Sequence, residues 1–76
     1  MTPQEKAKFL LSKHALTILS KIGHKLPMEE VKEIAKESIF IEVNEIIEVL
    51  KEVADEEVLA IHVIYWNKVK QETEAL

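Results

Sequence analysis

The stretch from Val43 to Trp66 constrains the fold most, because it is the longest apolar-rich run in the chain. Its first half carries apolar residues at the spacing of one helix face and mostly glutamates on the other side. Asn44 is placed to cap the start of a helix, and Glu45 beside it is favoured by the positive end of the helix dipole. The pattern therefore predicts a helix over about residues 42–54.

The second half of this stretch, from Val58 to Trp66, fits either a strand or a helix. It is dense in β-branched and aromatic residues, which suit a pleated, half-buried surface. The same residues also continue the helical stripe in phase, and residues 55–57 form either a loop or the cap and first turn of another helix. A helix over 58–66 would be apolar nearly all round, and a chain of 76 residues has little interior in which to bury it. We therefore predict a strand, with the helix as the open alternative.

The start of the chain predicts a capped helix. Thr2 stands at the N-cap, Pro3 at the first helical position and Glu5 at the third, as in a capping box. An apolar stripe then runs to Ile22, and Gly23 follows where a left-handed C-cap is expected. We predict a helix from Pro3 to Ile22.

The remaining connections are predicted from local signals. Pro27 opens a second helix that we expect to end near Ser38. Residues 39–41 are apolar and are interpreted as a hydrophobic turn packed under the helices, with a short strand as the alternative. We interpret residues 67–68 as a tight hairpin turn and the tail over 69–76 as an edge strand, a helix end or a frayed segment.

The order of these elements resembles the winged helix-turn-helix family. Residues 15–22 resemble the first core helix of that family, and residues 26–35 resemble the second. Residues 44–53 stand where the recognition helix would be, and residues 56–61 resemble the loop that leads into the wing. The resemblance implies a mainly α domain, a small α+β fold whose three-helix core is followed by a C-terminal strand or hairpin. It also implies a DNA-binding transcriptional regulator.

The chain departs from that family at two places. Ile39, Phe40 and Ile41 replace the polar, glycine-bearing turn that precedes the recognition helix, and no glycine follows Gly23 to give the wing a flexible tip. An all-α bundle of three or four helices therefore stays open as the alternative fold.

The charge pattern opposes DNA binding. The net charge is −4 and all ten basic residues are lysines, so the arginine fork that grips phosphate and reads guanine is missing. The exposed side of residues 42–54 is mainly acidic, which opposes attraction to phosphate. The residues that would contact DNA in this alternative are Lys21, Lys25, Asn44, Lys51, Lys68 and Lys70.

No catalytic or metal-binding motif is present in the sequence. The three histidines, His14, His24 and His62, have no partner at the spacing of a local metal pair, and we expect His24 in the turn after the first helix. Asp55 is the only aspartate, there is one glycine, and there is no cysteine. We predict that the chain is not an enzyme and needs no metal or cofactor.

The surplus of apolar residues predicts an interaction surface. Hydrophobic residues make up 47% of one small domain, residues 1–76, so some stay exposed unless the protein self-associates. In a strand, Tyr65 and Trp66 would point to opposite faces, so that one of them faces outward. The predicted interface residues are Ile39, Phe40, Ile41, Tyr65 and Trp66.

We therefore expect a non-enzymatic protein–protein interaction or regulatory module of winged-helix type that binds another protein or forms a homodimer. The chain lacks a signal-peptide pattern and an apolar run of membrane-spanning length, so we expect a cytoplasmic protein without membrane contact. Enrichment in lysine and glutamate without cysteine is typical of hyperthermophilic or designed proteins. A designed or structural helical domain with no partner is a further alternative.

Overall fold

The fold is all-helical. A computed structural model describes residues 1–23 and 25–76, so the expectation for His24 lies outside the described residues. Over the described residues the chain forms three α-helices and no strand: α1 (Pro3–Ile22), α2 (Met28–Val53) and α3 (Glu56–Ala75). The predicted α+β fold with a winged-helix arrangement is therefore wrong, and the chain has the all-helical fold that the sequence left open as the alternative.

Helix α1 forms as its terminal signals predict. The side chain of Thr2 accepts a hydrogen bond from the backbone N–H of Glu5, and the carboxylate of Glu5 accepts one from the N–H of Thr2, which completes a capping box. At the other end, the N–H of Gly23 donates to the carbonyl oxygen of Leu19. The predicted bounds of this helix are confirmed.

Helix α2 runs without interruption through residues 39–41, where the sequence predicted a turn. Neither glycine nor proline stands there, and the apolar stripes on the two sides are in phase, so one continuous helix satisfies the backbone hydrogen bonds of the whole segment. The buried residues of α2 recur every four positions and are Val31, Ala35, Ile39, Val43 and Ile47. Ile47 is the most exposed of them, at 9%. The predicted hydrophobic turn and the separate helix over 42–54 are corrected accordingly.

Helix α3 replaces the strand predicted over 58–66. Asp55 caps its start, because the side chain of Asp55 accepts a hydrogen bond of 3.0 Å from the N–H of Val58. An all-round apolar helix was expected to need burial on every side, which favoured a strand, but this helix leaves part of its apolar surface exposed. The predicted hairpin turn at residues 67–68 is also wrong, since α3 continues through it to Ala75.

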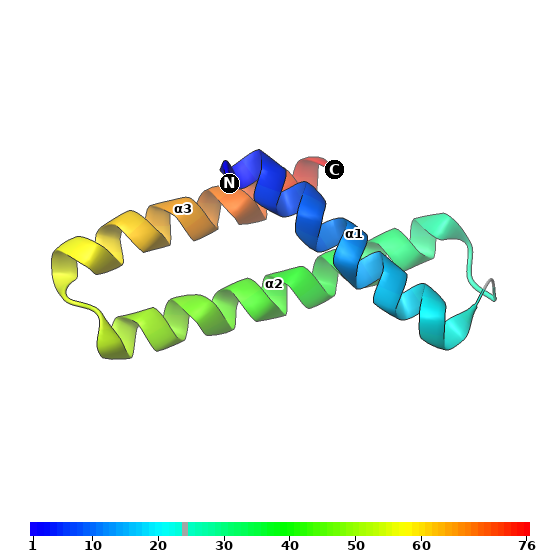
Figure 1. Ribbon diagram of the computed structural model, residues 1–76, viewed down its shortest axis with the longest axis horizontal. Coiled ribbons are helices and arrows are strands. Elements are labelled where there is room, and N and C mark those ends of the chain that lie inside the picture. Colours follow the sequence, from blue (N-terminus) through cyan, green and yellow to red (C-terminus); the bar gives the residue numbers. More distant parts are fainter. Residues whose placement is uncertain (24) are drawn as a thin grey trace.

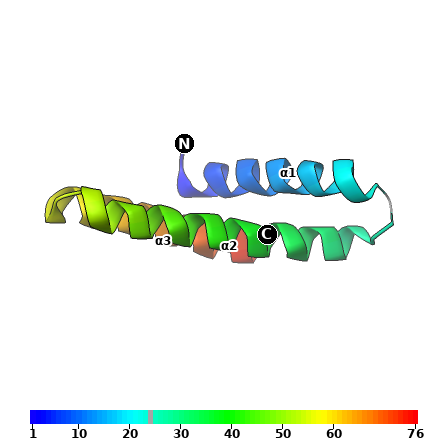
Figure 2. The ribbon, with the colours of Figure 1, turned by 90° about the horizontal axis from the view of Figure 1, so that it is seen from below.

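The three helices are arranged in two staggered layers. Helices α2 and α3 run antiparallel as a hairpin in one layer, and α1 crosses them from the other layer (Figures 1 and 2). The stagger makes the molecule elongated, with principal extents of 45 × 21 × 16 Å. The core lies where all three helices overlap and consists of Ala7, Leu10, Ile39, Val43, Ile47 and Val69.

Candidate interaction surface

Helix α1 covers only part of the α2–α3 hairpin. Figure 2 shows that the end of the hairpin that carries the α2–α3 connection extends well beyond the start of α1. The hydroxyl of Tyr65 donates a hydrogen bond of 3.1 Å to the carbonyl oxygen of Met1, which places the start of α1 beside Tyr65. The uncovered part of α3, from Glu56 to Tyr65, is therefore roughly 15 Å long at about 1.5 Å per residue.

The uncovered side of α2 can be identified from its contact with α1. Nε2 of His14 and Oε2 of Glu42 lie 2.7 Å apart, so Glu42 faces α1. Positions about two and three turns further along a helix return to the same side, and these positions are Val49 and Val53. Their exposed fractions are 57% and 75%. The side of α2 that contacts α1 at Glu42 thus continues as exposed valine.

Helix α3 also continues its α1-facing side as exposed apolar residues. Tyr65 faces the start of α1, and positions about one and two turns earlier return to that side of the helix. These positions are Ile61 and Val58, with exposed fractions of 69% and 43%, and the exposed His62 lies on the same side. We name the surface formed by Val49, Val53, Val58 and Ile61 the hairpin face.

The hairpin face gathers its exposed side chains on one side of two adjacent helices. Single exposed apolar residues are normal on proteins, whereas contiguous apolar surface marks an interaction site. All four residues are branched aliphatics on two neighbouring helices, and a shallow groove along α2 connects Val49 to Ile41, which is 63% exposed. The apolar surface therefore continues along α2 beyond the hairpin face itself.

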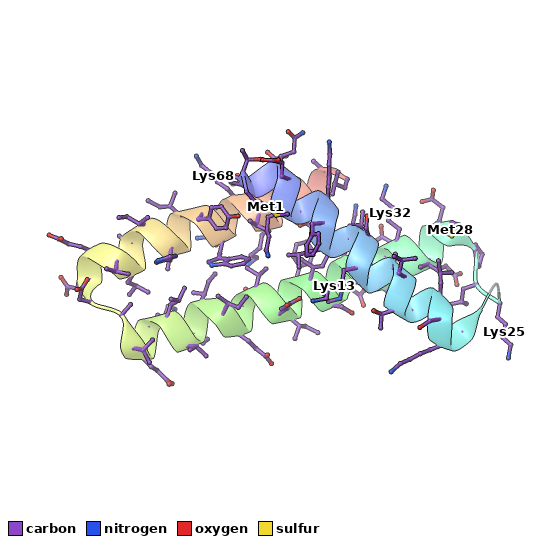
Figure 3. All side chains as sticks on the ribbon, viewed as in Figure 1. Met1, Lys13, Lys25, Met28, Lys32 and Lys68 are labelled. Carbon is purple, nitrogen blue, oxygen red and sulfur yellow. The ribbon has the colours of Figure 1, made fainter. Side chains whose placement is uncertain are left out.

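Opposite charges lie at the two ends of the hairpin face. The end at the α2–α3 connection, which we name the tip, carries four exposed carboxylates, those of Glu52, Asp55, Glu56 and Glu57. The end at the start of α1 instead carries the ammonium groups of Lys6, on α1, and Lys68, on α3, beside the single carboxylate of Glu5. Figure 3 shows Met1 and Lys68 at the same end of α1, and Nζ of Lys6 lies 5.9 Å from the centroid of the Trp66 ring. The face thus carries four aliphatic side chains and the exposed His62 in its middle, is acidic at one end and is mainly basic at the other.

The predicted interface residues are distributed between the core and the surface. Ile39 is fully buried, Phe40 is partly buried, and Ile41 is exposed. Tyr65 and Trp66 are partly buried against the core and pack edge to face, with ring centroids 5.3 Å apart. Because neighbouring side chains on a helix are separated by about 100°, these two residues do not point to opposite faces as they would in a strand.

The residues of the hairpin face are not among the interface residues that the sequence predicts. The signal of this face is present in the sequence, because Val58, Ile61 and Tyr65 follow the spacing of one helix side. The same residues were interpreted as part of a strand, in which Ile61 and Tyr65 share a face but Val58 lies on the opposite one. The distance that α1 reaches along the hairpin carries no local signal.

The residues proposed for DNA contact do not form one basic surface. Nζ of Lys70 donates to Oδ1 of Asn44 at 3.0 Å, and Nζ of Lys51 donates to Oε1 of Glu48 at 3.3 Å. Figure 3 shows Lys25 at the end of the molecule where α1 meets α2, well separated from Lys68. Lys21 lies in the last turn of α1, towards that same end.

The described residues hold no group of three or more histidine, cysteine, aspartate or glutamate side chains placed to bind a metal. His14 contacts Glu42 between α1 and α2, and His62 is exposed on α3. Over the same part of the chain, no helix is long and apolar enough to cross a membrane.

Comparisons with known proteins yield no match: no protein-family model, no curated protein and no solved structure is similar to this chain. They therefore neither support nor contradict the resemblance to the winged helix-turn-helix family. Any functional interpretation depends on the chain's own surface.

Proposed function

We propose that this chain is a non-enzymatic protein-interaction module that self-associates through the hairpin face. The observation that carries the proposal is the exposure of four branched aliphatic side chains, at 43% to 75%, on the part of the hairpin that α1 leaves uncovered. Burial of apolar surface stabilises association by about 25 cal/mol per Å². Covering this face would therefore favour a complex.

A second copy is a suitable partner because it presents the same geometry. Two hairpins packed face to face would form a local arrangement of four helices, in which apolar side chains of both copies are buried. A two-fold symmetric dimer uses one self-complementary patch, and this is the commonest form of homo-oligomer. The proposal therefore needs no surface beyond the hairpin face.

The mass of the wild-type protein, measured by sedimentation equilibrium over a wide concentration range, tests the proposal. We expect a reversible shift from monomer to dimer as the concentration rises. The variant Ile61→Lys places a charge on the hairpin face and should shift the dimerisation to much higher concentration, because a lysine cannot be buried there without a partner.

The variant Leu16→Lys is the matched control. Leu16 lies on α1, away from the hairpin face, and its exposed fraction of 67% is close to the 69% of Ile61. The two substitutions therefore change the same amount of exposed apolar surface. A wild-type protein that stays monomeric at the highest soluble concentration, or equal weakening by both variants, would contradict the proposal.

A further inference from the structure

We infer that two copies pack their hairpin faces antiparallel, so that the tip of each hairpin lies against the α1 start of the other copy. This inference rests on the proposed self-association and specifies its geometry. The position of α1 and the charges at the two ends of the face support it, and the size of the face determines the strength of the association.

The position of α1 excludes a parallel arrangement. In each copy, α1 lies on the same side of the hairpin as the hairpin face, in the layer that a partner must occupy (Figure 2). A partner hairpin that ran parallel would extend along this layer into α1. A partner that ran antiparallel would end at the start of α1 and continue in the other direction, past the tip, where nothing obstructs it.

The charges favour the same orientation. An antiparallel partner brings its four tip carboxylates towards the ammonium groups of Lys6 and Lys68. A parallel partner would instead bring the two acidic tips together. Complementary charges at the edge of an interface fix the orientation of the partners, whereas like charges oppose it.

Symmetry then determines which residues meet. When two identical helices cross antiparallel about a two-fold axis, the residue at the midpoint of the contact lies against its own counterpart. On α3 the uncovered segment runs from Glu56 to Tyr65, and Ile61 lies near its midpoint. Ile61 of one copy should therefore contact Ile61 of the other, while the two Asp55 residues lie at opposite ends.

The area of the face indicates a weak dimer. A face roughly 15 Å long and two helices wide, about 20 Å, covers about 300 Å² in projection. Stable protein interfaces bury about 800 Å² per partner, so this contact belongs with the small, transient ones. We therefore expect dissociation on dilution, and weaker association at high salt because salt screens the contacts at both ends.

Cross-linking through single cysteines tests the geometry, because the chain has no cysteine of its own. Three variants, Ile61→Cys, Asp55→Cys and Glu33→Cys, are oxidised separately with copper phenanthroline. A disulfide requires Cα atoms within about 7 Å, so only residues that meet across the two-fold axis should form one rapidly. We expect Ile61→Cys to cross-link at least tenfold faster than Asp55→Cys and the exposed control Glu33→Cys.

The outcomes separate this inference from the proposed function. Faster cross-linking of Asp55→Cys would show that the tips meet, and equal rates for all three variants would show that Ile61 is not at a two-fold contact; either result overturns the antiparallel packing. Association that strengthens with salt would also overturn it. A wild-type protein that is monomeric in sedimentation would instead overturn the proposed function.

Discussion

The hydroxyl of Tyr65 donates a hydrogen bond of 3.1 Å to the carbonyl oxygen of Met1, and so ties the first residue of the chain to α3. This contact marks the point along the hairpin where α1 begins. It therefore separates the part of the hairpin that belongs to the three-helix core from the part that carries the hairpin face.

Replacing Tyr65 with phenylalanine removes this hydrogen bond and keeps the ring. The bond is exposed, so we expect the free energy of unfolding to fall by no more than about 1 kcal/mol. Urea unfolding at a protein concentration that keeps the chain monomeric measures the change, and faster hydrogen exchange in the first turn of α1 should accompany it. Tyr65→Ala is the control and should cost more, because it also removes the ring from the core. Equal losses for the two variants would show that the hydroxyl, and not the ring, carries the stabilisation.

A second prediction concerns residues 39–41, where the sequence predicted a turn and α2 instead runs through. In α2, Ile39 is fully buried while Ile41 is 63% exposed. Ile39→Ala should therefore lower the free energy of unfolding by about 2–5 kcal/mol, the range for truncating a buried isoleucine. Ile41→Ala should change it by only about 0.5 kcal/mol, as is usual on a surface. Thermal or urea unfolding of the two variants compares them directly, and similar losses would contradict a continuous α2.

The fold was predictable from sequence where its signals are local. Local residues determine the two ends of α1: the capping box of Thr2 and Glu5 at its start, and Gly23 at its end. Each signal lies within one turn of the helix end, so it can be recognised in the sequence. At Val58 to Trp66, by contrast, two local signals conflict. The β-branched and aromatic side chains favour a strand, whereas Asp55 caps a helix, and the helix also continues the apolar stripe in phase.

The candidate surface was harder to predict from the sequence, because it depends on how the helices pack against one another. Composition indicates that some apolar side chains stay exposed, but the reach of α1 along the hairpin decides which ones. That reach depends on contacts between residues far apart in sequence, such as Tyr65 with Met1 and His14 with Glu42. Ile39 and Ile41 illustrate the same point, since the two isoleucines are only two positions apart and lie on opposite sides of α2.

Gly23 provides a third prediction, because its backbone conformation is one that other residues avoid. Its φ of 68° and ψ of −143° lie in a region that is essentially restricted to glycine. Open space surrounds the position of an added Cβ, so the cost of Gly23→Ala comes from the backbone and not from a clash. We expect a loss of about 1–3 kcal/mol in the free energy of unfolding.

A D-alanine at position 23, introduced by chemical synthesis, is the control for this prediction. A D-residue favours positive φ, so it should keep the conformation and match or exceed the stability of the glycine form. Thermal unfolding of the two alanine forms separates backbone strain from the effect of an added methyl group. Equal melting temperatures for L- and D-alanine would contradict the strain.

The capping box provides a prediction about pH. The backbone N–H of Thr2 donates to the Glu5 carboxylate, and this hydrogen bond is the main reason why the pKa of Glu5 lies below its ordinary value. A hydrogen bond with the Thr2 side chain lowers the pKa of Glu5 further. Because the folded pKa is lower than the unfolded one, the ionised form favours folding. This contribution is present above the ordinary pKa of glutamate and is lost as the pH falls through the lower pKa of the folded chain.

An NMR titration of the Glu5 side-chain carboxyl measures this shift directly. Its midpoint should lie below that of a glutamate in an unfolded peptide, and amide exchange in the first turn of α1 should speed up as the carboxyl takes its proton. Thr2→Ala is the control: it removes the side-chain cap, so the pKa of Glu5 should rise toward its ordinary value. A midpoint at the ordinary value in the wild-type chain would show that the capping box does not hold the carboxylate in solution.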